Sequence, residues 1–383
     1  MHKGFILYNY QKIPFVINDF KAELFSDSSI LDDFRKEYGS KTDFTIKGEC
    51  FDSGSLSRPI FLYVREFFAD TLYLHCYIVN MLSDEPNPDL IGFESPFLDD
   101  IFRYKYNYLE MVRDGINLDL EPKDIYIIPF AMNNDDYEAI YRIGRDNRMG
   151  LLEDFDRKGE LRIPLQNKTI QECYALSVIV NRLAKFMIAR SYVPFKRITL
   201  YKNGIKHGWL YTPNVTEGSF SGHEFDFCKM DVMKYIPKIL YIITKDPGNT
   251  IEHSVPLGHL GGFNSLFSPQ RFMEQVMAFE YIFDKIDHKK AQDSGYPLKK
   301  ELKEQFDKYP GLLAGSKLSS DNVSEKIKEI RRKIAHGYEY HYDFGNDIEK
   351  RFLMLKLDIL IQNMSLSYIG FTYDEIEDYN RKI

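Results

Sequence analysis

The pair of residues with the clearest chemical potential is Arg331 and His336, which four residues separate. An arginine supplies a fixed cation, and a histidine supplies a base that titrates near neutral pH. These are the two groups that RNA cleavage without a metal requires. In 383 residues with 9 histidines, chance predicts about 0.4 pairs at this spacing. The spacing alone is therefore weak evidence for an active site. The structural elements that position the two residues must provide further support.

The pair lies at the end of a helix that we expect over residues 322–336. Asn322, with Glu325 three residues later, predicts a variant capping box at its start, and Gly337 is typical of a residue that ends a helix. Its apolar residues recur every three or four positions and predict one buried stripe: Val323, Ile327, Ile330 and Ile334.

The two candidate side chains leave this helix in different directions. At 100° per residue they differ by about 140°, so Arg331 and His336 do not stack in a continuous helix. Arg331 borders the apolar stripe, and the carbonyls at the helix end favour the protonated form of His336. The two groups converge only if the helix frays or bends at residues 335–337, or if a second copy contributes its own pair. The geometry therefore favours a dimeric site.

The run RRKIAHGYEY, with Ile-Ala before His336 and Gly337 after it, resembles the HEPN superfamily, which carries Arg-x4–6-His in a helical bundle. The resemblance covers about residues 265–368. Together with the β-rich segment before it, it is most similar to the ApeA-like group of bacterial anti-phage proteins. It implies a homodimeric, metal-independent endoribonuclease toxin of abortive infection, answering a phage-derived trigger. Arg332 departs from the family, which usually has Asn, Asp or His there, and an arginine can instead grip a phosphate.

The expected chemistry needs neither a metal nor another cofactor. The 2′-hydroxyl of RNA is the nucleophile, His336 is the general base or acid, and Arg331 stabilises the charge that develops on phosphorus. The products are a 2′,3′-cyclic phosphate and a 5′-hydroxyl. Residues 285–340 carry a net charge of about +4, against -7 for the whole chain, which suits RNA but also describes a solvated bundle surface.

Further residues near the pair are candidates for RNA binding or for support of the site: Arg332, Lys333, Glu280, Tyr338 and His341. Each has an ordinary structural alternative. Arg332 has Glu329 one turn back, Glu280 can form a salt bridge within the bundle, and His341 can be an exposed loop residue. His336 can simply cap its helix. His223, Asp226 and Cys228 lack a second cluster with zinc-like spacing, so we expect no metal site.

The pattern of the chain predicts an α+β multidomain protein. Short runs of β-branched and aromatic residues indicate a β-rich sandwich or barrel-like domain, with a sensing or regulatory role, over residues 1–142. Residues 143–225 are interpreted as a connector that contains a helix and a hairpin turning at Asn203-Gly204. Residues 226–383 favour a HEPN-like helical bundle.

Composition excludes several classes of protein. The apolar content of 44% and the abundance of Tyr and Phe argue against a disordered chain. Residues 59–82 are too charged to span a membrane and are interpreted as paired strands. Four dispersed cysteines without a CxxC pair indicate reduced thiols in a cytoplasmic protein.

Two other functions remain open at this level. The bundle can be a non-catalytic HEPN interaction or sensor module that dimerises, with the β-rich domain binding a partner. A weaker alternative is a carbohydrate- or peptide-binding β-sandwich with an accessory helical tail. The sequence does not name the RNA target or the trigger.

Overall fold

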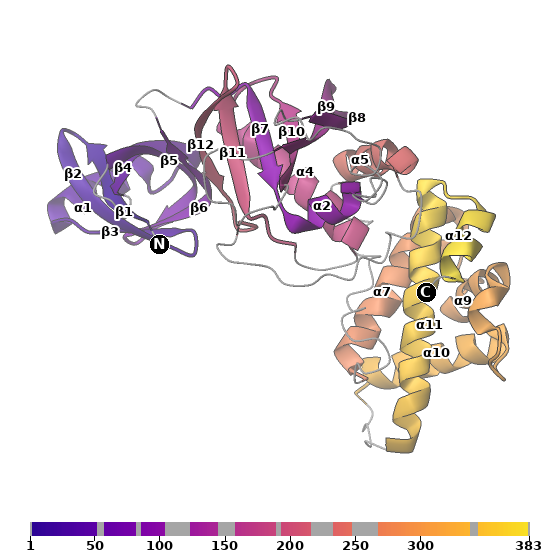
Figure 1. Cartoon of the computed structure of the whole chain (residues 1–383). Coiled ribbons are helices and arrows are strands. Elements are labelled where there is room, and N and C mark those ends of the chain that lie inside the picture. Colours follow the sequence, from indigo (N-terminus) through magenta and orange to yellow (C-terminus); the bar gives the residue numbers. More distant parts are fainter. Residues whose placement is uncertain are drawn as a thin grey trace. The chain divides into compact units, whose positions relative to one another are not determined.

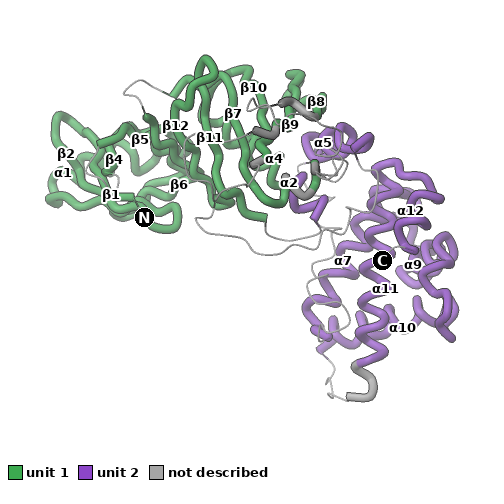
Figure 2. The backbone as a smooth tube through the Cα atoms, viewed as in Figure 1, with its two compact units in different colours: residues 1–181, 193–223 green, residues 182–192, 224–383 purple. Residues whose placement is uncertain are grey.

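The protein has a β-rich first unit and a helical second unit, as the sequence predicts (Figure 1). The first comprises residues 1–181 with 193–223, and the second residues 182–192 with 224–383 (Figure 2). The computed structural model describes the following residues: 2–51, 57–81, 86–103, 123–144, 158–188, 193–215, 233–246, 267–337 and 344–381.

A closed antiparallel barrel forms the beginning of the first unit. Its strands follow the order β3-β2-β1-β4-β5-β6, and pairing of β3 with β6 closes the ring. Alternate residues of these strands point into one core, which helix α1 (Ser28–Tyr38) completes with Leu31 and Phe34. The six strands are β1 (His2–Tyr8), β2 (Gln11–Asn18), β3 (Lys21–Leu24), β4 (Thr42–Phe51), β5 (Ser57–Phe68) and β6 (Thr71–Asn80).

Strand β6 links the barrel to a second set of strands. Its first residues pair with β3, whereas Tyr77–Asn80 pair with β12, so one strand belongs to both parts. From there the sheet continues in the order β12-β11-β7-β10-β9-β8. These strands are β7 (Leu90–Glu94), β8 (Lys123–Met132), β9 (Asp135–Gly144), β10 (Lys158–Pro164), β11 (Arg197–Lys202) and β12 (Ile205–Tyr211), accompanied by helices α2 (Pro96–Arg103) and α4 (Ile170–Ile188).

The helix and the hairpin predicted for residues 143–225 are both present, but they do not form a separate connector. Strands β10, β11 and β12 complete the sheet of the first unit, which therefore extends well beyond residue 142. The hairpin turn has φ of 52° at Asn203 and 75° at Gly204, as a type I′ turn requires.

The second unit is helical. Helix α7 packs against α11, and α10 packs against α9. Helix α7 buries its predicted stripe, including Phe272, Val276 and Phe279. The elements are η2 (Met233–Tyr235), α5 (Ile236–Lys245), α7 (Pro269–Ile286), α8 (His288–Ala291), α9 (Leu298–Lys308), η4 (Pro310–Leu313), α10 (Ser320–Ala335), α11 (Phe344–Ile369) and α12 (Tyr373–Asn380).

One helix among the described residues is long and apolar enough to cross a membrane. It is the part of α11 from Ile348 to Ile369, and 72% of its most apolar window is buried inside the protein. That burial is typical of the core helix of a soluble protein. Cys50, Cys76 and Cys173 are buried free thiols, as predicted, whereas Cys228 lies outside the described residues.

Candidate functional site

Helix α10 positions the Arg–His pair, and its start differs from the prediction. The helix begins at Ser320, and the capping residue is Ser319, whose hydroxyl accepts a hydrogen bond from the backbone N–H of Asn322 at 3.2 Å. The predicted cap, Asn322, lies inside the first turn. Several polar residues in this segment can cap a helix, and Ser319 is the one whose extended backbone and side-chain hydrogen bond meet the requirements of a cap.

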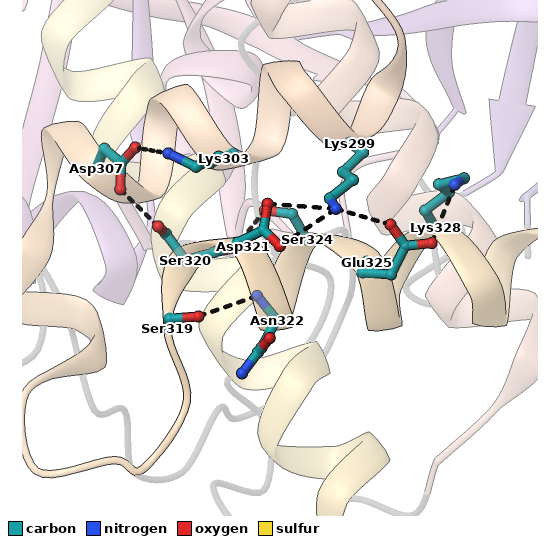
Figure 3. A network of polar contacts seen from close by, with 10 residues as sticks. All are labelled: Lys299, Lys303, Asp307, Ser319, Ser320, Asp321, Asn322, Ser324, Glu325 and Lys328. Atoms are coloured by element: carbon teal, nitrogen blue, oxygen red, sulfur yellow. Dashed lines mark hydrogen bonds and ion pairs between the residues drawn. The ribbon is translucent and has the colours of Figure 1, made fainter.

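A polar network anchors the first half of α10 to α9 (Figure 3). The Ser320 hydroxyl donates to Asp307 at 2.5 Å, and Lys303 holds the same carboxylate at 2.6 Å. Lys299 bridges Asp321 at 3.2 Å and Glu325 at 3.0 Å. The hydrogen bonds of Lys303 and Ser320 lower the pKa of Asp307. The beginning of α10 is therefore held in place by several partners.

The other end of α10 is more exposed. The helix ends at Ala335, His336 is the C-cap with φ of -97° and ψ of 5°, and Gly337 has a positive φ of 63°. The predicted termination at glycine is therefore confirmed, because Gly adopts this left-handed conformation without steric cost. His336 is exposed, which leaves its imidazole open to solvent.

The predicted apolar stripe of α10 becomes less buried toward the end of the helix. Val323 and Ile327 are fully buried, whereas Ile330 and Ile334 are only partly buried. Arg331 follows Ile327 by four residues, so it lies on the same side of α10, close to the packed interior. This position explains why Arg331 is half-buried although His336, near the end of the same helix, is exposed.

Arg331 meets Glu280 of α7. Its Nη2 lies 3.5 Å from Oε1 of Glu280, and the two side chains are 43% and 37% exposed. The Nε atom of Arg331 is buried and donates no hydrogen bond. The contact is long for an ion pair. Glu280 of α7 therefore orients the guanidinium, while other N–H groups of Arg331 remain able to donate hydrogen bonds to a bound oxyanion.

A second glutamate lies behind this contact. Glu301 of α9 is only 7% exposed, and burial followed by the charge of Glu280 raises its pKa to about 7. Burial also raises the pKa of Glu280 itself, while the charge of Arg331 opposes that rise. Three helices therefore supply one electrostatically connected group: Glu280 from α7, Glu301 from α9 and Arg331 from α10.

The remaining predicted residues fall into two groups. Arg332 and Lys333 are exposed on α10, and Arg332 makes no ion pair with Glu329 or with any other residue in the described ranges. Tyr338 and His341 lie outside the described residues, as do His223, Asp226 and Cys228. Elsewhere in the described chain, no three His, Cys, Asp or Glu side chains gather closely enough to hold a metal ion.

Sequence reasoning identified Glu280 but missed Glu301. A signal was present, since Glu301 and Gln305 alternate with Leu302 and Phe306 on the inner face of α9. A glutamate at a helical spacing shared with buried residues predicts an interior carboxyl, although not which neighbour it meets. No family model, curated protein or solved structure matches this chain.

Proposed function

We propose that this protein is a metal-independent endoribonuclease of the HEPN type, similar to the ApeA-like anti-phage proteins, acting in the cytoplasm. The observation that carries the proposal is that one glycine-terminated helix end carries both a half-buried Arg331, oriented by Glu280, and an exposed His336. The first is suited to hold a phosphate oxygen, and the second to exchange a proton with solvent or substrate.

In this mechanism, His336 accepts the proton of the ribose 2′-hydroxyl, whose oxygen attacks the adjacent phosphorus. Arg331 donates two hydrogen bonds to the nonbridging oxygens as negative charge develops on them. The P–O5′ bond breaks, and the 5′-oxygen takes a proton from a protonated histidine. One copy holds a single His336, so a second copy in a homodimer supplies the second proton-transfer group.

The charge on the outer face of α10 supports RNA as the substrate. Arg332 and Lys333 are exposed beside the pair, and neither is neutralised by a described acidic side chain. Exposed cations next to a phosphate-binding arginine raise the local concentration of a polyanion. Arg332, at the position where the family has a shorter polar residue, would contact a flanking phosphate in this arrangement.

The deciding experiment incubates the purified protein with total RNA in EDTA and maps the new ends. Wild type is expected to leave 2′,3′-cyclic phosphates and 5′-hydroxyls, and Arg331→Ala or His336→Ala should reduce cleavage by about 100-fold or more. Lys317→Ala and His288→Ala are matched controls, because each removes an exposed group of similar charge from the same unit. Cleavage by both α10 variants at the wild-type rate would overturn the assignment.

A second function has its own supporting observation. Met277 of α7 and Ile348 of α11 are 62% and 73% exposed, which is high for such apolar side chains. A contiguous apolar patch on a surface marks a protein contact, and exposed side chains of this kind would contribute to one. The alternative is a non-catalytic HEPN sensor that dimerises and binds a partner through the β-rich unit. Equal bacterial growth with wild type and His336→Ala, together with intact RNA in vitro, would favour it.

A further inference from the structure

The outward side of strands β2, β1 and β4 forms a continuous surface on the barrel wall, because these strands are neighbours in the sheet (Figure 1). We call this surface the outer barrel face. Successive residues of a strand point alternately to the core and to the outside. On β1, Ile6 belongs to the barrel core, so Phe5 and Leu7 lie on the outer barrel face. The strand register places Lys12 beside Leu7, Glu49 beside Phe5 and Phe51 beside Lys3.

The centre of the outer barrel face is apolar. Leu7 is 59% exposed and Phe51 is 47% exposed, whereas Phe5 between them is only 8% exposed. The rings of Phe5 and Phe51 lie 5.9 Å apart. Two exposed apolar side chains therefore border a nearly buried phenylalanine and form one apolar patch with it. An apolar patch with a polar rim is typical of a surface that contacts another protein.

The rim of this patch carries lysines that have no acidic partner. Lys3, Lys12 and Lys47 are exposed, and none of them forms an ion pair with a described residue. The ammonium group of Lys12 lies 4.1 Å from the centre of the Phe5 ring, and that of Lys47 lies 5.5 Å from the centre of the Phe61 ring. The three ammonium groups therefore surround the apolar patch without being neutralised by a described carboxylate.

Other cations of the same barrel, by contrast, have acidic partners. They are Arg35 with Asp32 and Asp70, Lys36 with Asp33, Lys41 with Glu37 and Arg65 with Glu66. On the outer barrel face, Glu49 accepts a hydrogen bond from the hydroxyl of Ser57 at 2.6 Å. On the adjacent β3, Lys21 and Glu23 bring one charge of each sign. The outer barrel face is therefore positively charged, although the chain as a whole has a net charge of -7.

We propose that the outer barrel face docks an acidic segment of another protein, in which carboxylates flank an apolar side chain. The apolar side chain covers the patch around Phe5, and the carboxylates pair with the three lysines. Complementary charges of this kind orient a partner and speed its association. A protein partner fits better than a nucleic acid, because Leu7 offers no ring on which a base can stack. It also fits better than a lipid surface, because the carboxylate of Glu49 lies beside Phe5.

The first test selects peptides from a displayed random library on the full chain. Counter-selection uses the variant Lys3→Gln, Lys12→Gln, Lys47→Gln. The selected peptides should carry Asp or Glu on both sides of a Leu, Ile or Phe. A synthetic peptide of the selected sequence should bind this variant about tenfold more weakly than wild type, or weaker still. Lys36→Gln is the matched control, because Lys36 is exposed but paired with Asp33, and it should bind the peptide as wild type does.

The second test locates the bound peptide on the protein. The full chain is acetylated with and without the peptide, and the modification of each lysine is quantified by mass spectrometry. The peptide should protect Lys3, Lys12 and Lys47 and leave the reactivity of Lys36 unchanged. The same measurement with an RNA oligonucleotide, with vesicles that contain phosphatidylserine and with increasing protein concentration examines three other occupants: a nucleic acid, a lipid surface and a second copy of the chain.

The outcomes decide the proposal without reference to RNA cleavage, so the ribonuclease assignment can fail or succeed independently. A selection that returns no peptide dependent on the three lysines, or only peptides without acidic residues, overturns the proposal. Protection of these lysines by RNA, by vesicles or by a second copy, but not by the peptide, overturns it as well. Should circular dichroism show that the lysine variant is unfolded, Leu7→Ser with Phe51→Ser replaces it, and an unchanged affinity for the peptide contradicts the proposal.

Discussion

Two buried glutamates, one in each unit, have almost the same exposure but opposite surroundings. Glu172 of α4 is 5% exposed and Glu301 of α9 is 7% exposed. The carboxylate of Glu172 accepts hydrogen bonds from the backbone N–H groups of residues 166–168, each at 2.7 Å, and from the hydroxyl of Tyr137 at 2.8 Å. Glu301 has no such donors among the described residues. Burial alone therefore does not determine what a carboxyl does.

The difference lies in how each charge is compensated. Four donors replace the water that the carboxyl group of Glu172 loses, and three of them hold the loop before α4 in place. For Glu301 the neutral form is the one that fits, and ionisation near neutral pH changes the charge of the helices around Arg331. The first glutamate is therefore part of the framework, whereas the second is suited to respond to pH.

The largest expected effect is the loss of the compensated carboxylate. Glu172→Ala should destabilise the first unit by about 3 to 5 kcal/mol, because it leaves four donors without their acceptor. This loss of stability can be measured by denaturant unfolding followed by the fluorescence of Trp209. Trp209 is the only tryptophan of the chain and lies in the first unit, as Glu172 does. Glu138→Ala, an exposed position on β9, is the control. Equal midpoints for the two variants would contradict this view of Glu172.

Substitution of Glu301 is expected to raise the stability of the protein, whereas substitution of Glu172 lowers it. Its pKa rises from an ordinary value of 4.5 to about 7 on folding, so its unfavourable contribution is absent well below pH 4.5, grows between pH 4.5 and about 7, and is constant above that. Glu301→Gln should therefore stabilise the protein by about 2 kcal/mol at pH 8 and hardly change its stability at about pH 4. Thermal unfolding followed by the helical signal tests this. A loss of stability at both pH values would show that Glu301 is a structural residue.

Removing a neutral hydrogen-bond acceptor should lower the stability less than removing the carboxylate of Glu172. The hydroxyl of Ser319 accepts one backbone N–H at the start of α10. Ser319→Ala should cost about 1 kcal/mol, and Ser319→Gly only a few tenths, because glycine also suits the cap position. Chemical denaturation of both variants provides the comparison. Equal losses would indicate that packing, and not the cap, is responsible.

The smallest effect on stability is expected at the proposed catalytic arginine. The Arg331–Glu280 contact is long and its side chains are 43% and 37% exposed, so Arg331→Ala should cost less than about 1 kcal/mol. The variant should thus unfold near the wild-type midpoint even though RNA cleavage is lost. A destabilisation of several kcal/mol would mean that Arg331 is needed for the fold.

Much of the local structure was predictable because it follows from short-range patterns. The stripe of α7, the hairpin at Asn203-Gly204 and the end of α10 at Gly337 all depend on residues within a few positions of one another. Other turns were missed. Asn9-Tyr10, Asp19-Phe20 and Asn133-Asn134 also have positive φ at both residues, without the glycine that marks such turns in a sequence.

The sequence by itself determined a β-rich part, a helical part and an Arg–His pair at a helix end, since periodicity and turn chemistry are local. Only the tertiary structure decided that the barrel closes through β3 and β6, and that residues beyond 142 complete the second set of strands in the first unit. It also decided that Glu280 and Glu301, from different helices, act on each other and through Glu280 on Arg331. This electrostatic coupling depends on the burial of the carboxyl groups and on their distance from Arg331. Both are created by the packing of helices, and the spacing of residues along the sequence does not predict them.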